Sequence, residues 1–401
     1  MNTLIQTDVF ISGGGVAGLT AAAAFGAAGF SVVCADPAPP ITDAARAGAD
    51  LRTTAFLQPA RDFLERIGLW APLAPHATAL HIMRIVDAGG PQAEARVAHD
   101  FNAADISDLP FGWNLPNWLL RREIVAHLAT LPHVDFRPGI GTAQLLTRAT
   151  EARVTLSDGS RISAKLVIGA DGRDSIVRKA AGIGARTLRY GQKALAFAVT
   201  HDQPHGNVST EIHRSGGPFT LVPLPDRDGR PCSAIVWMER GPEATRLAAL
   251  GDAEFEAAMT ERSAHLFGPL KLASRRTLWP IISQIADRMV GERVALVAEA
   301  AHVVPPIGAQ GLNMSLADLR VLLDLATGQR ADPGAPDLLA RYQRARHAEI
   351  LARVTGVDAL NRASMAEAQG LRDLRLKALN AIYKVAPVRR VMMRAGLGAK
   401  G

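Results

Sequence analysis

The start of the chain constrains its fold most strongly, because a strand, a glycine-rich turn, a helix and a second strand follow one another there. Residues 7–12 read as a short apolar strand, residues 16–28 as an alanine-rich helix, and residues 30–35 as a strand that ends at Asp36. The turn is Gly13-Gly14-Gly15-Val16-Ala17-Gly18, a G-x-G-x-x-G motif. In this setting it predicts a dinucleotide-binding βαβ unit rather than an ordinary glycine-rich turn.

The motif gives each glycine a role. Gly13 makes the tight turn, Gly15 lets the backbone approach a pyrophosphate, and Gly18 lets the helix pack closely on the strand. Asp36 can accept hydrogen bonds from the ribose hydroxyls of an adenosine. The cofactor-binding residues predicted here are Gly13, Gly15, Val16, Ala17, Gly18 and Asp36.

Residues 294–313 form a second organising stretch. It reads as a continuous apolar strand, a loop stiffened by two prolines and opened by Gly308 and Gly311, and then a helix. The free amides of the first helical turn, from Gly311 to Asn313, form a site for negative charge. We therefore predict a flat occupant that becomes anionic when it is reduced.

Three segments of this stretch carry a family resemblance: Glu299-Ala-Ala-His302, Pro305-Pro306 and Gly308-Ala-Gln-Gly-Leu-Asn313. They resemble the third fingerprint of the single-component flavoprotein aromatic hydroxylases, the group of p-hydroxybenzoate hydroxylase. Within that group the chain is most similar to the ubiquinone-biosynthesis hydroxylases of the UbiH and UbiF type. It departs from them at Ala298-Glu299, where the family usually has Gly-Asp. That Asp binds the ribityl chain of FAD, and Glu299 is one methylene longer.

The resemblance extends to an arginine on each side of residue 100. Arg52, in the segment Asp50-Leu-Arg-Thr-Thr-Ala55, matches an Arg that lies near the flavin. The alternative for Arg52 is a solvated surface position. Arg122, at the start of a predicted helix, matches an Arg that contacts the cofactor near its phosphates, where bidentate donors suit the task. Arg121 is then the solvent-facing neighbour.

A further fingerprint lies at Asp171-Gly172, within a segment that reads as strand, turn and helix. The resemblance places this Asp beneath the pyrophosphate and gives the segment a part in NAD(P)H binding. The alternative for Asp171 is a helix cap worth about 1 kcal/mol, and both roles fit one turn. The residues that the resemblance assigns to FAD are Arg52, Arg122, Asp171, Gly172, Glu299, Gly308, Gly311, Leu312 and Asn313.

The predicted fold class is α/β: a Rossmann-like FAD-binding domain with an inserted antiparallel-sheet substrate domain and a C-terminal helical segment. A length of 401 residues fits two closely joined domains. We assign residues 1–75, 100–183 and 280–362 to the first domain, 76–99 and 184–279 to the second, and 363–401 to the helical segment. The candidates for an apolar sheet face over the flavin are Phe219, Leu221, Pro223 and Trp237.

The resemblance also implies a reaction. The FAD of this class is reduced by NAD(P)H or another donor, traps O₂ as a C4a-hydroperoxide, and delivers a hydroxyl group to an electron-rich ring. The amides from Gly311 would stabilise reduced flavin by up to ~2 kcal/mol, and Pro306 with its neighbour Pro305 would exclude water. His302 is a candidate base because histidine titrates in the useful range, and a hydrogen-bonded structural role is its alternative. No metal site is predicted.

The working hypothesis is hydroxylation of a polyprenylated phenol in ubiquinone biosynthesis. Three alternatives stay open. One is the hydroxylation of a small soluble phenol, and another is a FAD-dependent prenyl reductase that consumes no oxygen. The third is a non-catalytic accessory subunit of a quinone-synthesis complex, which the departure at Ala298-Glu299 leaves open.

The charge of the chain is local. Residues 371–401 hold eight basic residues and one acidic residue, so they account for the whole net charge of +7. A basic end on a neutral body favours an acidic surface over a nucleic acid. The expected partners of this end are a membrane surface or other quinone-synthesis proteins. The structural alternative is a helix that only packs on the body of the protein.

Cysteine usage and the absence of leader signals bear on location. Cys34 and Cys232 are far apart in the sequence, which suggests neither a disulfide framework nor a thiol redox centre. Residues 9–35 carry no charge, but six glycines argue against a membrane span. No basic residue precedes Arg46, so no secretory signal is predicted. We expect a cytoplasmic protein, peripheral on the inner membrane face.

Overall fold

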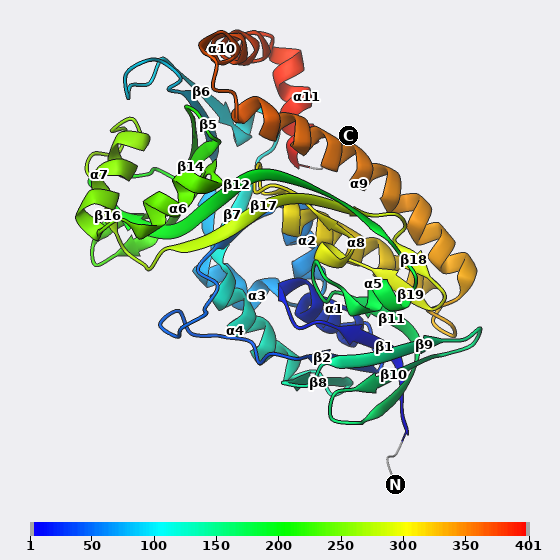
Figure 1. Cartoon of the computed structure of the whole chain (residues 1–401). Coiled ribbons are helices and arrows are strands. Elements are labelled where there is room, and N and C mark those ends of the chain that lie inside the picture. The colour runs from blue at the N-terminus through cyan, green and yellow to red at the C-terminus, as the bar shows by residue number, and fades with distance from the viewer. Residues whose placement is uncertain (1–3, 398–401) are drawn as a thin grey trace.

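In a computed structural model, which describes residues 4–397, the chain folds around two large sheets, and the long helix α9 (Pro336–Ser364) runs along both (Figure 1). The first sheet has a parallel centre in the order β19-β11-β1-β2-β8, and β18, β10 and β9 extend it in antiparallel fashion. Its strands are β1 (Leu4–Ser12), β2 (Val32–Asp36), β8 (Val134–Pro138), β9 (Thr142–Thr147), β10 (Ala152–Leu156), β11 (Arg161–Gly169), β18 (Val290–Gly291) and β19 (Val294–Leu296).

Helix α1 (Val16–Ala27) packs on this sheet between α4 and α8. Small residues allow this close approach, because a Cβ on Gly18 would lie 1.9 Å from the carbonyl oxygen of Gly13 and one on Gly26 would lie 2.3 Å from Val134. The predicted βαβ unit is therefore confirmed. The other helices of this body are α2 (Gln58–Arg66), α3 (Trp70–Leu73), α4 (Asn117–Leu128), α5 (Ile176–Ala180), α8 (Gln310–Gly328) and α9 (Pro336–Ser364), with 3₁₀ turns η1 (Ala74–His76), η2 (Ala103–Asp105) and η3 (Ala298–Ala300).

The second sheet is antiparallel except for the pair β13 and β5, in the order β20-β17-β12-β15-β14-β13-β5-β6. Helices α6 (Gly241–Ala249) and α7 (Asp252–Arg262) cover one of its faces with a separate apolar core. Its strands are β5 (Ile82–Asp87), β6 (Val97–Asn102), β12 (Ala185–Thr200), β13 (Val208–His213), β14 (Pro218–Arg227), β15 (Arg230–Arg240), β16 (Lys271–Leu272), β17 (Thr277–Ala286) and β20 (His302–Val303). A third, small sheet holds β3 (Thr53–Leu57), β7 (Gly112–Pro116) and β4 (Thr78–Leu80).

Two of the predicted domain boundaries fall inside strands. The boundary at 99/100 cuts β6, and the boundary at 279/280 cuts β17, so residues 100–102 and 280–286 pair within the second sheet. The reason is that β17 is long enough to pair with β12 along most of its length. The α/β fold class and the inserted antiparallel sheet are as predicted.

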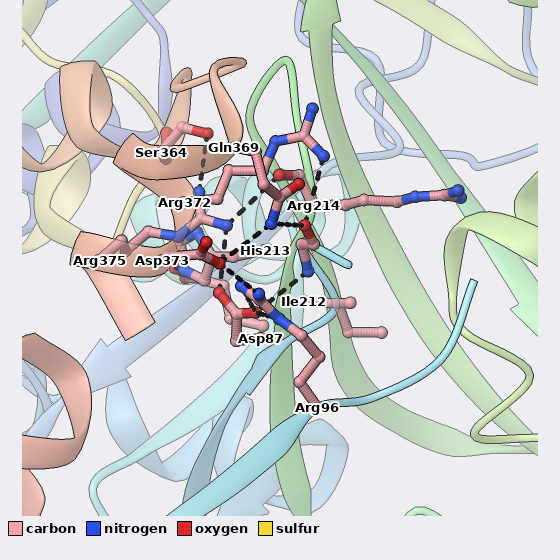
Figure 2. Close-up of polar contacts among 12 residues, drawn as sticks. Asp87, Arg96, Ile212, His213, Arg214, Ser364, Gln369, Arg372, Asp373 and Arg375 are labelled. Atoms are coloured by element: carbon pink, nitrogen blue, oxygen red, sulfur yellow. Dashed lines mark hydrogen bonds and ion pairs between the residues drawn. The ribbon is translucent and has the colours of Figure 1, made fainter. Parts of the chain in front are cut away.

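The C-terminal helices α10 (Gln369–Lys384) and α11 (Ala386–Leu397) lie against β5 and β6 at one end of the molecule (Figure 1). A buried carboxylate, Asp87, holds α10 there, since its oxygens lie 2.7 Å from Nε of Arg96 and 3.2 Å from Nη2 of Arg375 (Figure 2). Arg96 also pairs with Asp373 of α10 at 2.6 Å. Lys400, which belongs to the predicted basic end, lies outside the described residues.

Candidate functional site

Three neighbouring parallel strands bring the fingerprints together at one sheet edge. β11 pairs with β1 on one side and β19 on the other, and all three run in the same direction. Gly13, Asp171 and Ala298 follow the carboxyl ends of these strands. In open α/β sheets, ligands bind at this edge. Segments that are far apart in the sequence therefore meet where a nucleotide cofactor belongs.

Direct contacts join these segments. A Cβ on Gly13, where φ is +110°, would lie 2.3 Å from the carbonyl oxygen of Ala170, so only glycine fits. Arg173 donates from Nε to Oε2 of Glu299 at 3.0 Å. The buried Arg178 donates to the carbonyl oxygen of Ala300 at 2.9 Å. The second and third fingerprints are thus fixed relative to each other by two arginines that our reading of the sequence did not single out.

At two glycine positions of the site, the backbone conformation does not require glycine. Gly15 has φ −67°, and Gly311 lies in α8, yet a Cβ on either would meet nothing within 4 Å. A Cβ on Gly172 would also meet nothing, although its φ of +82° favours glycine in any case. Open space therefore lies in front of all three. This is what a cofactor that touches the backbone requires.

The helices that begin at this space leave their first amides free. Neither α1 nor α8 has a side-chain cap at its amino end. The two helices pack against each other; α1 directly follows β1, and α8 follows β19 of the same sheet after η3, β20 and the loop. Their positive ends, with the amides of Val16, Ala17 and Leu312, therefore open toward one region, which favours phosphate at α1 and an anionic ring at α8.

Asp36 ends β2 beside the glycine turn. Its Oδ2 accepts from the Gly14 amide at 2.5 Å and its Oδ1 from the Ala38 amide at 2.8 Å. A carboxylate can accept further hydrogen bonds, so the ribose role predicted for Asp36 remains compatible with its position. Asp171 accepts from the hydroxyl of Ser175 and, at 3.0 Å, from the amide of Val177. Asp171 thus binds an amide at the amino end of α5, as its structural alternative predicts, although the N-cap residue itself is Ser175.

Arg52 is held on two sides. Its guanidinium donates to both oxygens of Asp50, at 2.8 and 2.7 Å, and stacks over the ring of Trp279 at 4.3 Å from the centroid. Burial alone would raise the pKa of Asp50, but the hydrogen bonds and charge of Arg52, with Asn117 and Arg121, hold it below its ordinary value. Arg52 is 35% exposed and bound both to Asp50 and to Trp279 of the second sheet, so it is not a freely solvated side chain.

The expectation that Arg121 faces solvent is wrong. Arg121 is 23% exposed and its Nη2 lies 3.8 Å from Asp50, whereas Arg122 is 44% exposed and pairs with Glu123. Because α4 begins at Asn117, both arginines lie inside the helix, and the face of the helix turned toward the site carries Arg121. Arg121, beside Asp50 and Arg52, is the better placed of the two for a cofactor contact.

Ala298 stands in the left-handed region with φ +54°, where the family's usual glycine would be unstrained. The next residue, Glu299, is 47% exposed and pairs with Arg173. The charge of Glu299 also acts on Arg52. Its carboxylate therefore stays at the site despite the longer side chain.

His302 is not placed to act as a base, which corrects that prediction. It is 2% exposed, and its Nε2 lies 2.6 Å from Oδ2 of Asp318. Asp318 is also fully buried and accepts from Nε of Arg346 at 2.8 Å. The three side chains form a buried network that joins β20, α8 and α9. The structural alternative for His302 is the correct one.

The loop before α8 differs from the prediction in detail. The helix begins at Gln310 rather than Gly311, after Gly308 and Ala309, both with positive φ. The side chain of Asn313 accepts from the Leu57 amide at 2.9 Å and donates to the Ala55 carbonyl at 2.8 Å, so it ties α8 to β3. Because α8 begins at Gln310, the Asn313 amide is the first that can pair within the helix, which leaves the free amides to residues 310–312. Pro306 is exposed toward solvent, whereas Pro305 is buried.

The predicted apolar face of the second sheet is turned away from the flavin loop. Phe219, Leu221 and Trp237 belong to the core under α6 and α7, and Pro223 is buried and accepts from Asn114. Side chains alternate along a strand, so the partners Thr220 and Val236 lie on the other face. Val236 packs in a cluster with Ile307 and Val304, which makes this second face the one that meets the loop.

A basic cavity of about 420 Å³ lies beside the second fingerprint, between α5 and the strands β12 and β17. Arg173, Arg178, Lys179 and Arg189 line it, with Asp174. Lys179 and Arg189 are exposed, and neither forms an ion pair with any residue from 4 to 397. The cavity therefore presents two free cations.

Other chemistry is limited. Both cysteines are free and buried, and burial raises the pKa of the Cys232 thiol to about 11 and that of Cys34 further. Among residues 4–397 no group of three or more His, Cys, Asp and Glu side chains could hold a metal ion. Within the same range, no helix combines the length and apolar character that crossing a bilayer requires.

The comparisons with known proteins agree with this geometry. A family model described as an FAD binding domain matches residues 6–356. Ubiquinone hydroxylase UbiL of Rhodospirillum rubrum is 35% identical over 400 residues, which cover 98% of this chain and 89% of that protein. The 3-demethoxyubiquinol 3-hydroxylase of Escherichia coli is 27% identical over 399 residues, 98% of each chain.

Solved structures support the fold. The p-nitrophenol 4-monooxygenase PnpA of Pseudomonas putida has a TM-score of 0.79 at 19% identity, with 99% of this chain and 100% of that chain covered. PqsL of Pseudomonas aeruginosa has a TM-score of 0.77 at 23% identity, with 92% and 100% covered. The open space in front of Gly15, Gly172 and Gly311, which we call the glycine space, and the two uncapped helix ends fit FAD. The chain therefore belongs to the FAD-binding family of flavin-dependent monooxygenases and hydroxylases, and FAD is its cofactor.

Proposed function

We propose that the protein hydroxylates an electron-rich aromatic ring, that of a polyprenylated phenol, in ubiquinone biosynthesis. The observation that carries the proposal is the open space in front of each of Gly15, Gly172 and Gly311, in a chain 35% identical to a ubiquinone hydroxylase along nearly its whole length. The bound flavin would supply oxygen activation. The protein supplies position, charge and exclusion of water.

The parts of the chain divide this work. The amide groups of Val16 and Ala17 and the turn at Gly13–Gly15 would hold the diphosphate, and Asp36 the adenosine ribose. Glu299, kept at the site by Arg173, would meet the ribityl chain. The amides at the start of α8 would face the isoalloxazine, and Arg52 would add positive charge beside it.

The substrate ring is proposed to lie beside the contact between the flavin loop and the second sheet. The loop contributes Val304 and Ile307, and the sheet contributes Val236 with its partner Thr220. Packing between these groups would exclude water from the reacting ring. This placement assigns no base to the phenol hydroxyl, because His302 is too deeply buried to reach it.

We propose NAD(P)H as the reductant and the basic cavity beside the second fingerprint as the place where its phosphates bind. The supporting observation is the pair of free cations, Lys179 and Arg189, on the segment that follows Asp171-Gly172. Charge-assisted hydrogen bonds from such groups suit phosphate. We also propose that the basic C-terminal segment contacts a membrane surface, where a polyprenylated substrate would reside.

Two measurements test the proposed reaction. A strain lacking the protein is expected to lose ubiquinone and to accumulate a prenylated precursor one oxygen poorer than the next intermediate, and the wild-type chain should restore the profile. The purified protein with FAD, NADPH and that precursor is expected to add one oxygen atom by mass. A normal quinone profile in the mutant strain would remove the pathway assignment. A product that has gained two hydrogen atoms and no oxygen would instead indicate a prenyl reductase.

A further inference from the structure

The outward surface of α10 and α11 carries an unusual concentration of exposed apolar side chains. Of the 14 large hydrophobic residues that are exposed between residues 4 and 397, six lie within residues 371–392. They are Leu371 (55%), Leu374 (62%), Val385 (49%), Val388 (45%), Val391 (65%) and Met392 (48%). We call these six residues the outward face. Exposed apolar side chains gathered in this way on two neighbouring helices point to an interaction site.

Helical spacing separates this face from the side that holds the helices to the body. On α11, Val388, Val391 and Met392 stand at positions i, i+3 and i+4, whereas Met393 and Leu397 are buried. The buried pair packs with Leu57, Phe101 and Phe111. The two sides of α11 are thus both apolar, and only one of them is covered by the protein.

The basic residues of the two helices divide in the same way. Arg372 and Arg375 point toward the body, where they bind Gly89 and Asp87 (Figure 2). Arg389 also points toward the body and binds Asp105. The other four, Lys377, Lys384, Arg390 and Arg394, are exposed and form no ion pair within residues 4–397. The inward arginines serve attachment, so the four outward cations are left for a partner.

Negative charge is nearly absent from this surface. The sole acidic residue between 371 and 397 is Asp373, and Arg96 pairs with it at 2.6 Å. The outward face therefore combines apolar side chains with unneutralised cations at its margin. That combination is complementary to an anionic lipid surface, into which the apolar residues enter while the cations stay at the headgroups.

We infer that the outward face of α10 and α11 docks the protein on an anionic bilayer. The inference rests on the proposed function to the extent that a polyprenylated substrate would have to come from a bilayer. The docked helices also adjoin the flavin loop, because Gln310, at the start of α8, donates to the carbonyl oxygen of Gly396 at 3.2 Å. A substrate leaving the membrane beside α11 therefore has a short way to the site.

Co-sedimentation of the FAD-loaded protein with vesicles tests the inference without substrate or reductant. Binding is expected to vesicles of phosphatidylcholine with phosphatidylglycerol, to be much weaker with phosphatidylcholine alone, and to decline as salt rises. Val391→Asp should abolish it. The double substitution Lys384→Gln with Arg390→Gln should weaken it about fivefold for each charge removed.

Matched controls separate docking from damage. Leu146 is 56% exposed on β9, far from α10 and α11 (Figure 1), so Leu146→Asp should bind vesicles like the wild type. Arg186, 88% exposed on β12, provides the charge control Arg186→Gln. Each variant should retain FAD and its circular dichroism. Equal loss of binding in the controls, or equal binding to both kinds of vesicle, would overturn the inference.

A second copy of the chain is the competing occupant. Light scattering that shows a dimer, dissociated by Val391→Asp, together with no vesicle binding, would also overturn the inference. Vesicle binding by a protein that adds no oxygen to a prenylated phenol would leave the docking surface in place and remove the proposed function. The two failures are therefore distinguishable.

Discussion

Single residues at this site are constrained by backbone conformation, space or charge, and each constraint has a different signature. Gly13 needs both its positive φ and its lack of a side chain, whereas Gly15 and Gly311 need only the space. Ala298 violates the first constraint, because it adopts φ +54° with a Cβ. Such departures are measurable as stability differences.

Ala298→Gly should stabilise the protein by about 0.5–1 kcal/mol. Relief of left-handed strain, about 1–2 kcal/mol, outweighs the extra entropy of glycine in the unfolded chain, about 0.5–1 kcal/mol. Denaturant unfolding of the FAD-free protein checks this. Ala300→Gly, in the same 3₁₀ turn but without a positive φ, should destabilise. A loss of stability in both variants would refute the strain argument.

Asp50→Asn should destabilise the protein near neutral pH by about 1–3 kcal/mol, because it weakens the support of Arg52. The pKa of Asp50 is lowered in the folded state, so its contribution is present above the ordinary value of 3.8 and is lost as pH falls through the folded pKa. Unfolding free energies measured from pH 7 to pH 3 should therefore converge for variant and wild type.

The exposed carboxylate Asp62 supplies the control for this pH dependence. It is 62% exposed and pairs with Arg61 on the surface, so Asp62→Asn should cost at most about 1 kcal/mol. If the gap between Asp50→Asn and wild type stayed constant down to pH 3, the carboxylate of Asp50 would not be the source of the effect.

At the scale of elements, short segments supply the contacts that hold the fingerprints and the C-terminal helices in place. The α5 segment closes the second fingerprint with Arg178 and, with β12 and β17, forms the basic cavity. The α10 helix is attached through one buried carboxylate, Asp87. Each element can be tested by removing the charge on which it depends.

Lys179→Gln and Arg189→Gln should each raise the KM for NADPH about fivefold, the equivalent of about 1 kcal/mol for a partly exposed charge. The FAD content and the rate with a chemical reductant should stay unchanged, because neither residue touches the glycine space. Arg186→Gln, on the same strand as Arg189 but outside the cavity lining, is the control. An unaltered KM in both cavity variants would exclude this cavity as the reductant site.

Asp87→Ala should release α10 from β5 and β6. It leaves Arg96 and Arg375 without their buried partner, at a cost of about 3–5 kcal/mol. Hydrogen exchange is expected to speed up in α10 and to stay slow in α1. Asp373→Ala, which removes an exposed partner of Arg96, should cost no more than about 1 kcal/mol. Unchanged exchange in α10 would show that apolar packing alone holds it.

At the scale of the whole molecule, local patterns predicted the frame well. The βαβ unit, the strand before α8 and the antiparallel insertion follow from periodicity and glycine placement, which are visible in a few consecutive residues. The three fingerprints meet because parallel strands end at one edge. The sequence alone was therefore enough to predict that the three fingerprints meet.

What the sequence could not provide depends on contacts between distant segments. No local signal shows that Trp279 stacks on Arg52 or that Asp318 and Arg346 enclose His302. The choice between Arg121 and Arg122 depended on where α4 begins, and a shift of one residue turns a helix by about 100°. Phe219 lies in β14 and its partner Trp237 in β15, and β15 carries apolar side chains on both faces, so alternation did not reveal which face meets the loop.

The most direct test of the account is FAD affinity, measured by fluorescence titration of wild type, Gly311→Leu and Gly356→Leu. Both glycines are exposed, helical and open to an added side chain, but Gly356 lies in the interior of α9, where no free amides of a helix start are presented. We predict that the FAD affinity of Gly311→Leu falls at least tenfold while its fold stays intact, and that Gly356→Leu binds FAD like the wild type. Full retention of FAD affinity in Gly311→Leu would contradict the claim that the flavin lies against the start of α8.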